Sequence, residues 1–169
     1  YVVPSNGGNP TRMTDNKSND AVASWSRDGR WIYFMSNRTG QPQVWKMPSA
    51  GGEPVQVTTK GGYAALEAPD GKTLYYSRTA GTSSLWKLPL QGGLEAEVVD
   101  AVTFLNFALG RKGVYFISSS ALSQRFIQYL DIATGKTEAI AAIGRYGTNG
   151  LSVSPDERTV LYAQQDQLT

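Results

Sequence analysis

A glycine that recurs at a nearly constant interval constrains the fold of this chain more than any other feature. Gly29 is followed by Gly71 and then by Gly113, each 42 residues on, and Glu157 stands 44 residues after Gly113. Sequence repeats of about 20–50 residues indicate structural units that stack on one another, because one unit cannot bury its apolar face alone. The sequence therefore predicts a repeat protein.

Each repeat contains four short β-type runs, which are clearest in residues 21–58. Aspartate, glycine, proline and asparagine separate the runs and favour turns. The third run, WKMP at 45–48, recurs as WKLP at 86–89. Four antiparallel strands per unit at this period are typical of the blades of a β-propeller. The predicted fold class is therefore an all-β propeller of four-stranded antiparallel blades, and the four runs are Ala21–Ser26, Trp31–Ser36, Gln43–Pro48 and Val55–Thr58.

Complete blades are predicted only in the middle of the chain, and a partial blade stands at each end. The first residues align with the third and fourth strands of a blade, and the last residues align with the first and second strands. Together they amount to about four blades in a single propeller domain or half-propeller. The predicted units are residues 1–14 (partial), 21–58, 64–100, 104–143 and 150–169 (partial).

The partial blades favour association, because unpaired strand edges pair readily with other strands. Four blades could close within one chain, two chains could form an eight-bladed ring, or the chain could be part of a longer array. Four blades is the small extreme for propellers. The favoured partner is therefore a second copy in a homodimer that completes the ring, and the alternative partner is the rest of a longer chain.

The composition narrows the chemistry that the chain can perform. Its 169 residues include no cysteine and no histidine, and its net charge is +2. Without histidine it lacks the usual general base of Ser-His-Asp catalysis and the commonest transition-metal ligand. The net charge is too small to indicate nucleic acid binding, and no apolar run reaches the roughly 18 residues of a membrane span. We therefore expect no enzyme activity, no cofactor, no metal site, and neither nucleic acid nor membrane as a partner.

The best-preserved repeat reads ASWSRDGRWIYF at 23–34, and parts of it recur as PDG at 69–71 and SPD at 154–156. This motif resembles the WD-like repeat of bacterial TolB-type propellers, A-x-W-S-P-D-G-(K/R) followed by an aliphatic and aromatic strand. Arg27 replaces the proline of that pattern. The order of repeats is similar to the C-terminal propeller region of multidomain bacterial regulators. The resemblance also implies a periplasmic or other extracytoplasmic location.

Glu67 interrupts an otherwise apolar column of residues. It falls on the first strand of its unit, at the position held by Trp25, Leu109 and Val153 in the other units. A carboxylate there must meet water, a partner group or a cation, because burying it unpaired is costly. We expect Glu67 to pair with a neighbouring group such as an arginine, or to hold a ligand or cation.

The strand order places longer loops on one rim and tight turns on the other. We call the first rim the loop-rich face; its loops are residues 15–20, 37–41, 59–63, 79–83, 119–124 and 144–150. Rigid scaffolds commonly present binding residues on such loops. The face is predicted to be mildly basic, and together with Glu67 its candidate ligand- or partner-binding residues are Arg38, Tyr63, Arg78, Arg145 and Tyr146.

These features favour a non-enzymatic propeller scaffold or sensor module that binds a protein, peptide or small ligand through the loop-rich face. One alternative is an accessory propeller domain of a larger hydrolase or peptidase. Another is a glycan-binding propeller, which predicts matching aromatic pockets in every blade. Tyr63 and Tyr146 have no counterpart in residues 15–20, so the glycan hypothesis ranks last.

Overall fold

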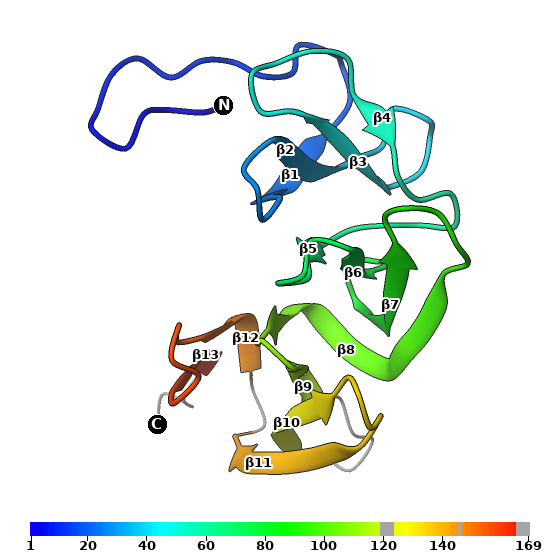
Figure 1. Cartoon of the computed structure of the whole chain (residues 1–169), viewed down its shortest axis with the longest axis vertical. Coiled ribbons are helices and arrows are strands. Elements are labelled where there is room, and N and C mark those ends of the chain that lie inside the picture. Colours follow the sequence, from blue (N-terminus) through cyan, green and yellow to red (C-terminus); the bar gives the residue numbers. More distant parts are fainter. Residues whose placement is uncertain (119–123, 145–146, 165–169) are drawn as a thin grey trace, which may run out of the picture.

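The structure is an arc of antiparallel β-sheets (Figure 1). The computed structural model describes residues 1–118, 124–144 and 147–164, and every regular element in these residues is a strand, which confirms the predicted all-β architecture. The strands form sheets of four, seven and two members. They are β1 (Asp20–Trp25), β2 (Trp31–Ser36), β3 (Gln43–Pro48), β4 (Val55–Gln56), β5 (Ala65–Glu67), β6 (Thr73–Ser77), β7 (Thr82–Pro89), β8 (Ala96–Leu109), β9 (Gly113–Ser118), β10 (Arg125–Asp131), β11 (Thr137–Ile143), β12 (Gly147–Val153) and β13 (Val160–Gln164).

The first sheet, β1 to β4, is the blade that the sequence shows most clearly. β2 and β3 pair without interruption along their full length. In the turn between β1 and β2, the Asp28 carboxylate accepts hydrogen bonds from the Arg30 main-chain N–H (3.0 Å) and the Ser26 hydroxyl (2.7 Å). Gly29 follows with a φ of 71°, a conformation that costs a residue with a side chain more than it costs glycine. The Asp-Gly pair thus fixes the turn.

Residues 1–14 form an arm with the geometry of the outer half of a blade. Val2 and Thr11 exchange two main-chain hydrogen bonds (2.9 and 2.8 Å), in the register in which Lys46 pairs with Val55 in the first sheet. The two turn glycines of the arm have φ values of 97° and 131°, and those between β3 and β4 have 94° and 137°. The arm therefore repeats β3, β4 and their turn.

One long strand, β8, joins the second and third blades. The sequence predicts two separate strands in this segment, at 94–99 and 104–109, and that division is wrong. Val102 pairs with Ser83 of β7 on one side and with Ser118 of β9 on the other. The connection between the blades is extended enough to join both ladders, so β5 to β11 form one seven-stranded sheet.

The turn of the third blade departs from the repeat. The Gly110 N–H donates to the Gly113 carbonyl oxygen (2.9 Å), so the turn is shorter and Gly113 begins β9. Among the other turns, Gly71 and Glu157 have φ values of 67° and 59°, close to the value at Gly29. Glu157 thus adopts the turn-glycine conformation, and Gly113 does not.

Apolar clusters fill the spaces between neighbouring blades. Tyr33 and Val44 of the first blade pack with Leu74 and Tyr76 of the second. Leu151 of β12 packs with Ile117 and its neighbours in the third blade. The remaining clusters lie between the second and third blades and between the arm and the first sheet. Because both faces of a blade are covered, its second strand is apolar along nearly its whole length.

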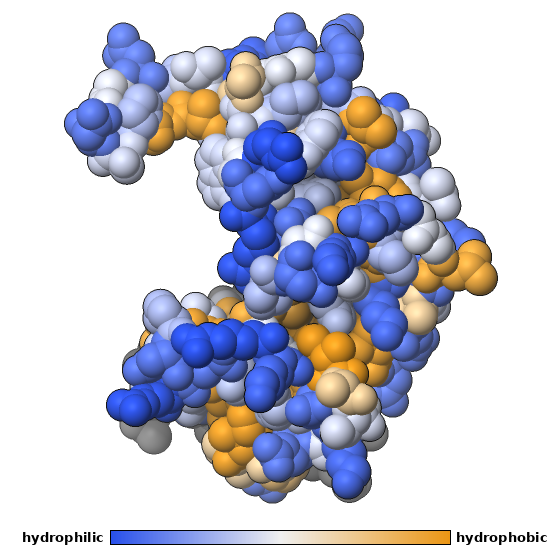
Figure 2. All heavy atoms as spheres, viewed as in Figure 1, coloured by the Kyte–Doolittle hydropathy of each residue, from blue (hydrophilic) through white to orange (hydrophobic). Residues whose placement is uncertain are grey.

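The arc is open, with the arm at one end and β12 and β13 at the other (Figure 1). Within the described residues, the isolated bridge between Val2 and Thr11 pairs the arm only with itself, and β13 forms a ladder only with β12. Closure of four blades within one chain is therefore not the arrangement found. Figure 2 shows the same arc with its inner side hollowed.

Candidate functional site

Glu67 lies at the end of β5 and reaches back to the first blade. Its side chain is buried, and Oε2 accepts a hydrogen bond from the Tyr33 hydroxyl at 2.7 Å. Oε1 accepts from the main-chain N–H of Arg27 at 3.1 Å, and the Arg27 Nε donates to the Glu67 main-chain oxygen at 3.1 Å. Burial and the nearby carboxylate both raise the pKa of Tyr33. We call Arg27, Tyr33 and Glu67 the first clasp. The Glu67 carboxylate thus pairs with a tyrosine hydroxyl and with the main chain of Arg27, whereas the guanidinium of Arg27 binds the Glu67 main-chain oxygen.

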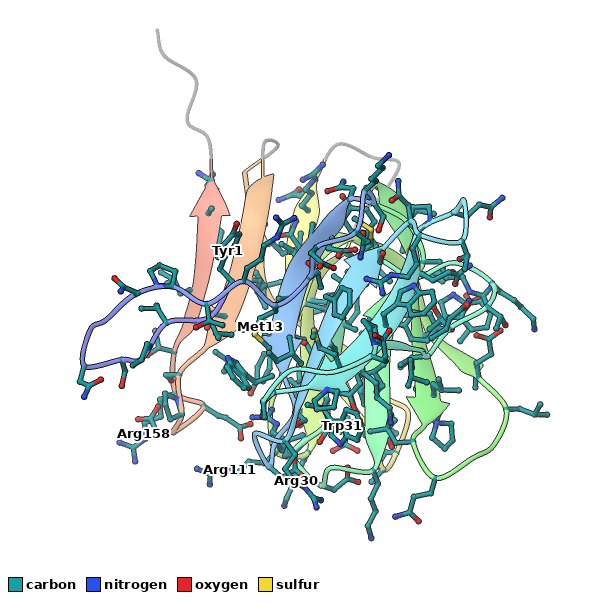
Figure 3. All side chains as sticks on the ribbon, turned by 90° about the horizontal axis from the view of Figure 1, so that it is seen from above. Tyr1, Met13, Arg30, Trp31, Arg111 and Arg158 are labelled. Carbon is teal, nitrogen blue, oxygen red and sulfur yellow. The ribbon has the colours of Figure 1, made fainter. Side chains whose placement is uncertain are left out.

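A second clasp joins the third blade, which ends with β9 to β11, to the partial fourth blade, which consists of β12 and β13. The Glu157 Oε1 accepts from the Arg111 main-chain N–H at 2.9 Å and lies 3.5 Å from the Arg111 Nε. The Tyr115 hydroxyl lies 3.5 Å from the other carboxylate oxygen. Figure 3 shows Arg111 on the same rim as Arg30 and Arg158, which all belong to turns between first and second strands.

Sequence reasoning missed the second clasp. It aligned Glu157 with the turn glycine Gly71, whereas the carboxylate of the first clasp comes from Glu67. A Cβ atom at Gly71 would nevertheless lie 3.5 Å from the Glu67 Oε1. A side chain at position 71 therefore starts close to the point that the Glu67 carboxylate occupies. The available signal was an arginine before the turn and a tyrosine on the second strand, present in both the first and third blades.

The inner strands line a hollow of about 340 Å³ on the concave side of the arc. Trp25 is 57% exposed there, and Leu66, Phe107 and Ser152 lie on the same wall. Arg27 and Glu67 also border the hollow, but they bond to each other in the first clasp. The lining of the hollow is therefore mixed in polarity, with an exposed tryptophan beside hydroxyl and charged side chains.

Arg38 is tied into the loop-rich face. Its guanidinium lies 4.7 Å from the centre of the Trp45 ring and 3.2 Å from the Asp20 carboxylate, and both charged side chains are largely buried. Burial would raise the pKa of Asp20, but hydrogen bonds from Ser36 and other neighbours, and from Arg38, outweigh it and lower the pKa. This group connects the loop after β2 to the start of β1.

Arg78 makes a similar arrangement in the second blade. Its guanidinium lies 3.3 Å from the centre of the Trp86 ring and donates to Glu95 at 2.7 Å. Lys60 lies 3.0 Å from the same carboxylate, and the Tyr76 hydroxyl donates to it. Burial and the Glu95 hydrogen bond raise the pKa of Tyr76 to about 12. We call these groups around Arg38 and Arg78 the two arginine clusters.

The other predicted binding residues lie near these clusters or outside the described residues. Tyr63 is half-buried in the connection between the first two blades, where its main-chain N–H donates to the Ser77 carbonyl oxygen (2.7 Å). Arg145 and Tyr146 fall outside the described residues. The structure thus places Arg38, Tyr63 and Arg78 on the loop-rich face and Glu67 in the first clasp. Ligand binding by any of these residues stays a prediction.

Residues 1–118, 124–144 and 147–164 contain no group of three or more histidine, cysteine, aspartate or glutamate side chains that could hold a metal ion. They also contain no helix long and apolar enough to cross a membrane.

Residues 1–103, more than half of the chain, match the family model of the TolB beta propeller domain. The chain belongs to this TolB propeller family. The predicted TolB-type repeat is therefore confirmed.

Three proteins that are similar to this TolB-type chain come from bacteria. An uncharacterised protein of Agrobacterium fabrum is 38% identical over 58 residues, which are 34% of this chain and 20% of that protein. TolB from Acinetobacter baumannii superposes with a TM-score of 0.77 at 21% identity, over 91% of this chain and 40% of that one. An oligogalacturonate lyase from Vibrio parahaemolyticus gives a TM-score of 0.73 at 16% identity, over 92% of this chain and 50% of that one.

The two structural likenesses show a shared fold. The chain spans at most half the length of each of these three proteins. One of them is a lyase and another is TolB, so the fold occurs in an enzyme as well as in TolB itself.

Proposed function

We propose that this chain is a non-enzymatic binding module of the TolB type, which presents its loop-rich face to a protein or peptide. The observation that carries the proposal is the pair of arginine clusters, which hold this face through stacked guanidinium groups and largely buried ion pairs. A surface that is ordered before binding loses less conformational entropy when a partner arrives. The two arginine clusters therefore hold the loops of this face in place before a partner binds.

The connection at 59–63 offers binding groups on the loop-rich face. Lys60 is exposed while it contacts Glu95, and Tyr63 is half-buried three residues further on. Tyrosine is enriched among interface anchors because its ring supplies a large contact area, and the lysine ammonium adds a positive charge that can orient a carboxylate. This pair favours a peptide that carries a carboxylate next to an apolar side chain.

Peptide selection tests the proposal. A phage library of random linear peptides would be panned against the chain, and the selected peptides measured by calorimetry against Tyr63→Ala and Lys60→Ala. We expect binding to weaken at least about tenfold in these variants, since an interface anchor contributes more than about 1.4 kcal/mol. Lys112→Ala and Arg158→Ala, on the opposite rim, serve as matched controls and should bind as wild type. Failure to select any peptide, or unchanged binding by Tyr63→Ala, would contradict the proposal.

The likeness to an oligogalacturonate lyase keeps an accessory or catalytic role in carbohydrate chemistry as the second candidate. Incubation with oligogalacturonate, followed by detection of unsaturated products, separates the candidates. The binding-module proposal expects no turnover and no binding of the oligosaccharide. Turnover by this chain would replace the proposal with an enzymatic function.

A further inference from the structure

The N-terminal end of the arc carries an open apolar groove. The groove has a volume of about 190 Å³ and lies between the arm and the first sheet. Figure 3 shows Tyr1 and Met13 on the arm that borders it. We call it the end groove; its lining residues include Val2, Met13, Ala23, Trp25, Ile32 and Phe34.

The other end of the arc carries an apolar hairpin. Leu161 of β13 is 72% exposed, and Tyr162 beside it is also exposed. In the described residues, β13 forms a strand ladder with β12 alone, so no strand pairs with its second edge. Likewise, Val2 directs its main-chain N–H and carbonyl to Thr11, and the opposite edge of that strand is open. An exposed apolar strand edge favours pairing with another strand.

These ends are complementary halves of one blade. The arm has the register and turn geometry of a third and fourth strand. The hairpin has the register of a first and second strand, because Ser152 pairs with Leu161 as Ser24 pairs with Tyr33. We propose that a second copy of this chain inserts its β12–β13 hairpin into the end groove, so that the two halves form a complete four-stranded blade.

The two intact blades define the register of this junction. Tyr33 pairs with Lys46 in the first blade, and the equivalent Tyr75 pairs with Lys87 in the second. Leu161 and Val2 hold the corresponding positions, so Leu161 of one copy lies opposite Val2 of the other. Val160 then lies opposite Val3, and Tyr162 opposite Tyr1.

The side chains fit this register. In the first blade, Tyr33 packs against Ala65, Leu74 and Tyr76 of the next blade. The equivalent residues of the first blade are Ala23, Ile32 and Phe34, and all three line the end groove. Leu161, inserted at the position of Tyr33, therefore packs on the groove wall that these three residues form; Ala23 is exposed in the single copy, whereas Ile32 and Phe34 are already largely buried. The apolar surfaces of the end groove and of the hairpin are then both removed from water, which favours association.

The groove of one copy meets the hairpin of another. Because the two contacting surfaces differ, the contact is heterologous. Such contacts generate closed rings when the rotation closes and open chains when it does not. The proposal concerns the junction itself and applies to either assembly. It does not depend on the ligand of the loop-rich face, so the two proposals fail independently.

Disulfide trapping tests the register directly, because the chain has no cysteine of its own. Val2→Cys in one tagged copy and Leu161→Cys in an untagged copy would be mixed and oxidised. Val2 makes its main-chain hydrogen bonds to Thr11, so the new pair is non-hydrogen-bonded and its side chains are close enough for a disulfide. We expect a reducible tagged–untagged dimer from this mixture. Val2→Cys mixed with Val160→Cys is the control, since a shift of one residue turns the side chain to the other face.

Light scattering supplies an independent readout. We expect the wild-type chain to show masses at multiples of 18.3 kDa that increase with concentration. Leu161→Asp should give the monomer mass with an unchanged circular dichroism spectrum, because the side chain is exposed in one copy. Leu94→Asp, at a residue that is 92% exposed, is the matched control and should assemble as wild type. A wild-type monomer at the highest concentration tested, or trapping that is equal in both cysteine mixtures, would overturn the proposal.

Discussion

The two clasps use the same residue types, yet one is buried and the other lies at the surface. In the first clasp, the carboxylate extends from a strand and bonds to the Tyr33 hydroxyl at 2.7 Å. In the second, it extends from a turn, its tyrosine is 3.5 Å away, and the Arg111 side chain is exposed. The comparison indicates that a carboxylate can reach the same point at a blade boundary from either of two sequence positions.

The largest expected effect comes from removing the buried carboxylate. Glu67→Ala leaves the Tyr33 hydroxyl and the Arg27 N–H without their acceptor. Loss of a buried, charged hydrogen-bond partner costs about 3 kcal/mol. We therefore expect the free energy of unfolding in urea to decrease by about that amount. A loss no larger than that of Glu157→Ala would contradict the contrast between the clasps.

Moving the carboxylate tests whether the two positions are interchangeable. Glu67→Val combined with Gly71→Glu gives the second blade the arrangement of the fourth, where Val153 and Glu157 stand. The new Glu meets a φ of 67°, which costs about 1–2 kcal/mol. We expect the double variant to be more stable than Glu67→Val alone, and urea unfolding of both would measure the recovery. Gly71→Ala is the control for backbone strain. If the double variant is no more stable than Glu67→Val alone, positions 67 and 71 are not interchangeable.

Alkaline titration distinguishes the buried Tyr33 of the first clasp from the half-buried Tyr115 of the second. The pKa of Tyr33 is raised, whereas tyrosines in an unfolded chain ionise near pH 10. The protonated hydroxyl thus stabilises the fold fully below about pH 10, and this contribution is lost as the pH rises toward the folded pKa. We expect stability to fall above pH 10, and to fall less steeply in Tyr33→Phe. Tyr115→Phe should change the slope less, because its hydroxyl is only partly buried; equal slopes would remove the distinction.

The smallest expected effect is that of Glu157→Ala. Its salt bridge to Arg111 is exposed, and such pairs contribute about 0–1 kcal/mol. The change in urea unfolding should therefore stay below about 1 kcal/mol. High salt should reduce this difference further and leave the Glu67→Ala effect nearly unchanged, because a buried pair is screened less.

Much of the fold could be predicted from local patterns. Turn residues such as Asp28 and Gly29 act within a few residues, so the strands around them follow from the sequence. The link through Val102 could not be predicted in the same way, because its pairing depends on Ser83 and Ser118 from two different blades. The short turn before Gly113 likewise depends on the register of a whole strand pair.

The candidate site was harder to predict, because its partners are distant in the sequence. Glu67 was identified because a carboxylate is unusual at an apolar position. Glu157 escaped notice because a polar residue is ordinary in a turn. The sequence also gave no sign that Arg38 and Arg78 would stack on tryptophans and pair with Asp20 and Glu95, since those contacts form only when the blades fold.

The continuity of β8 has a mechanical consequence. Hydrogen-bonded main chain carries load across the boundary between the second and third blades, whereas in the part of the chain that the structure describes no strand ladder crosses the first–second or the third–fourth boundary. Both clasps lie at those two boundaries. We therefore expect the arc to bend more easily at these two boundaries, because apolar packing and individual hydrogen bonds, rather than a strand ladder, hold the blades together there.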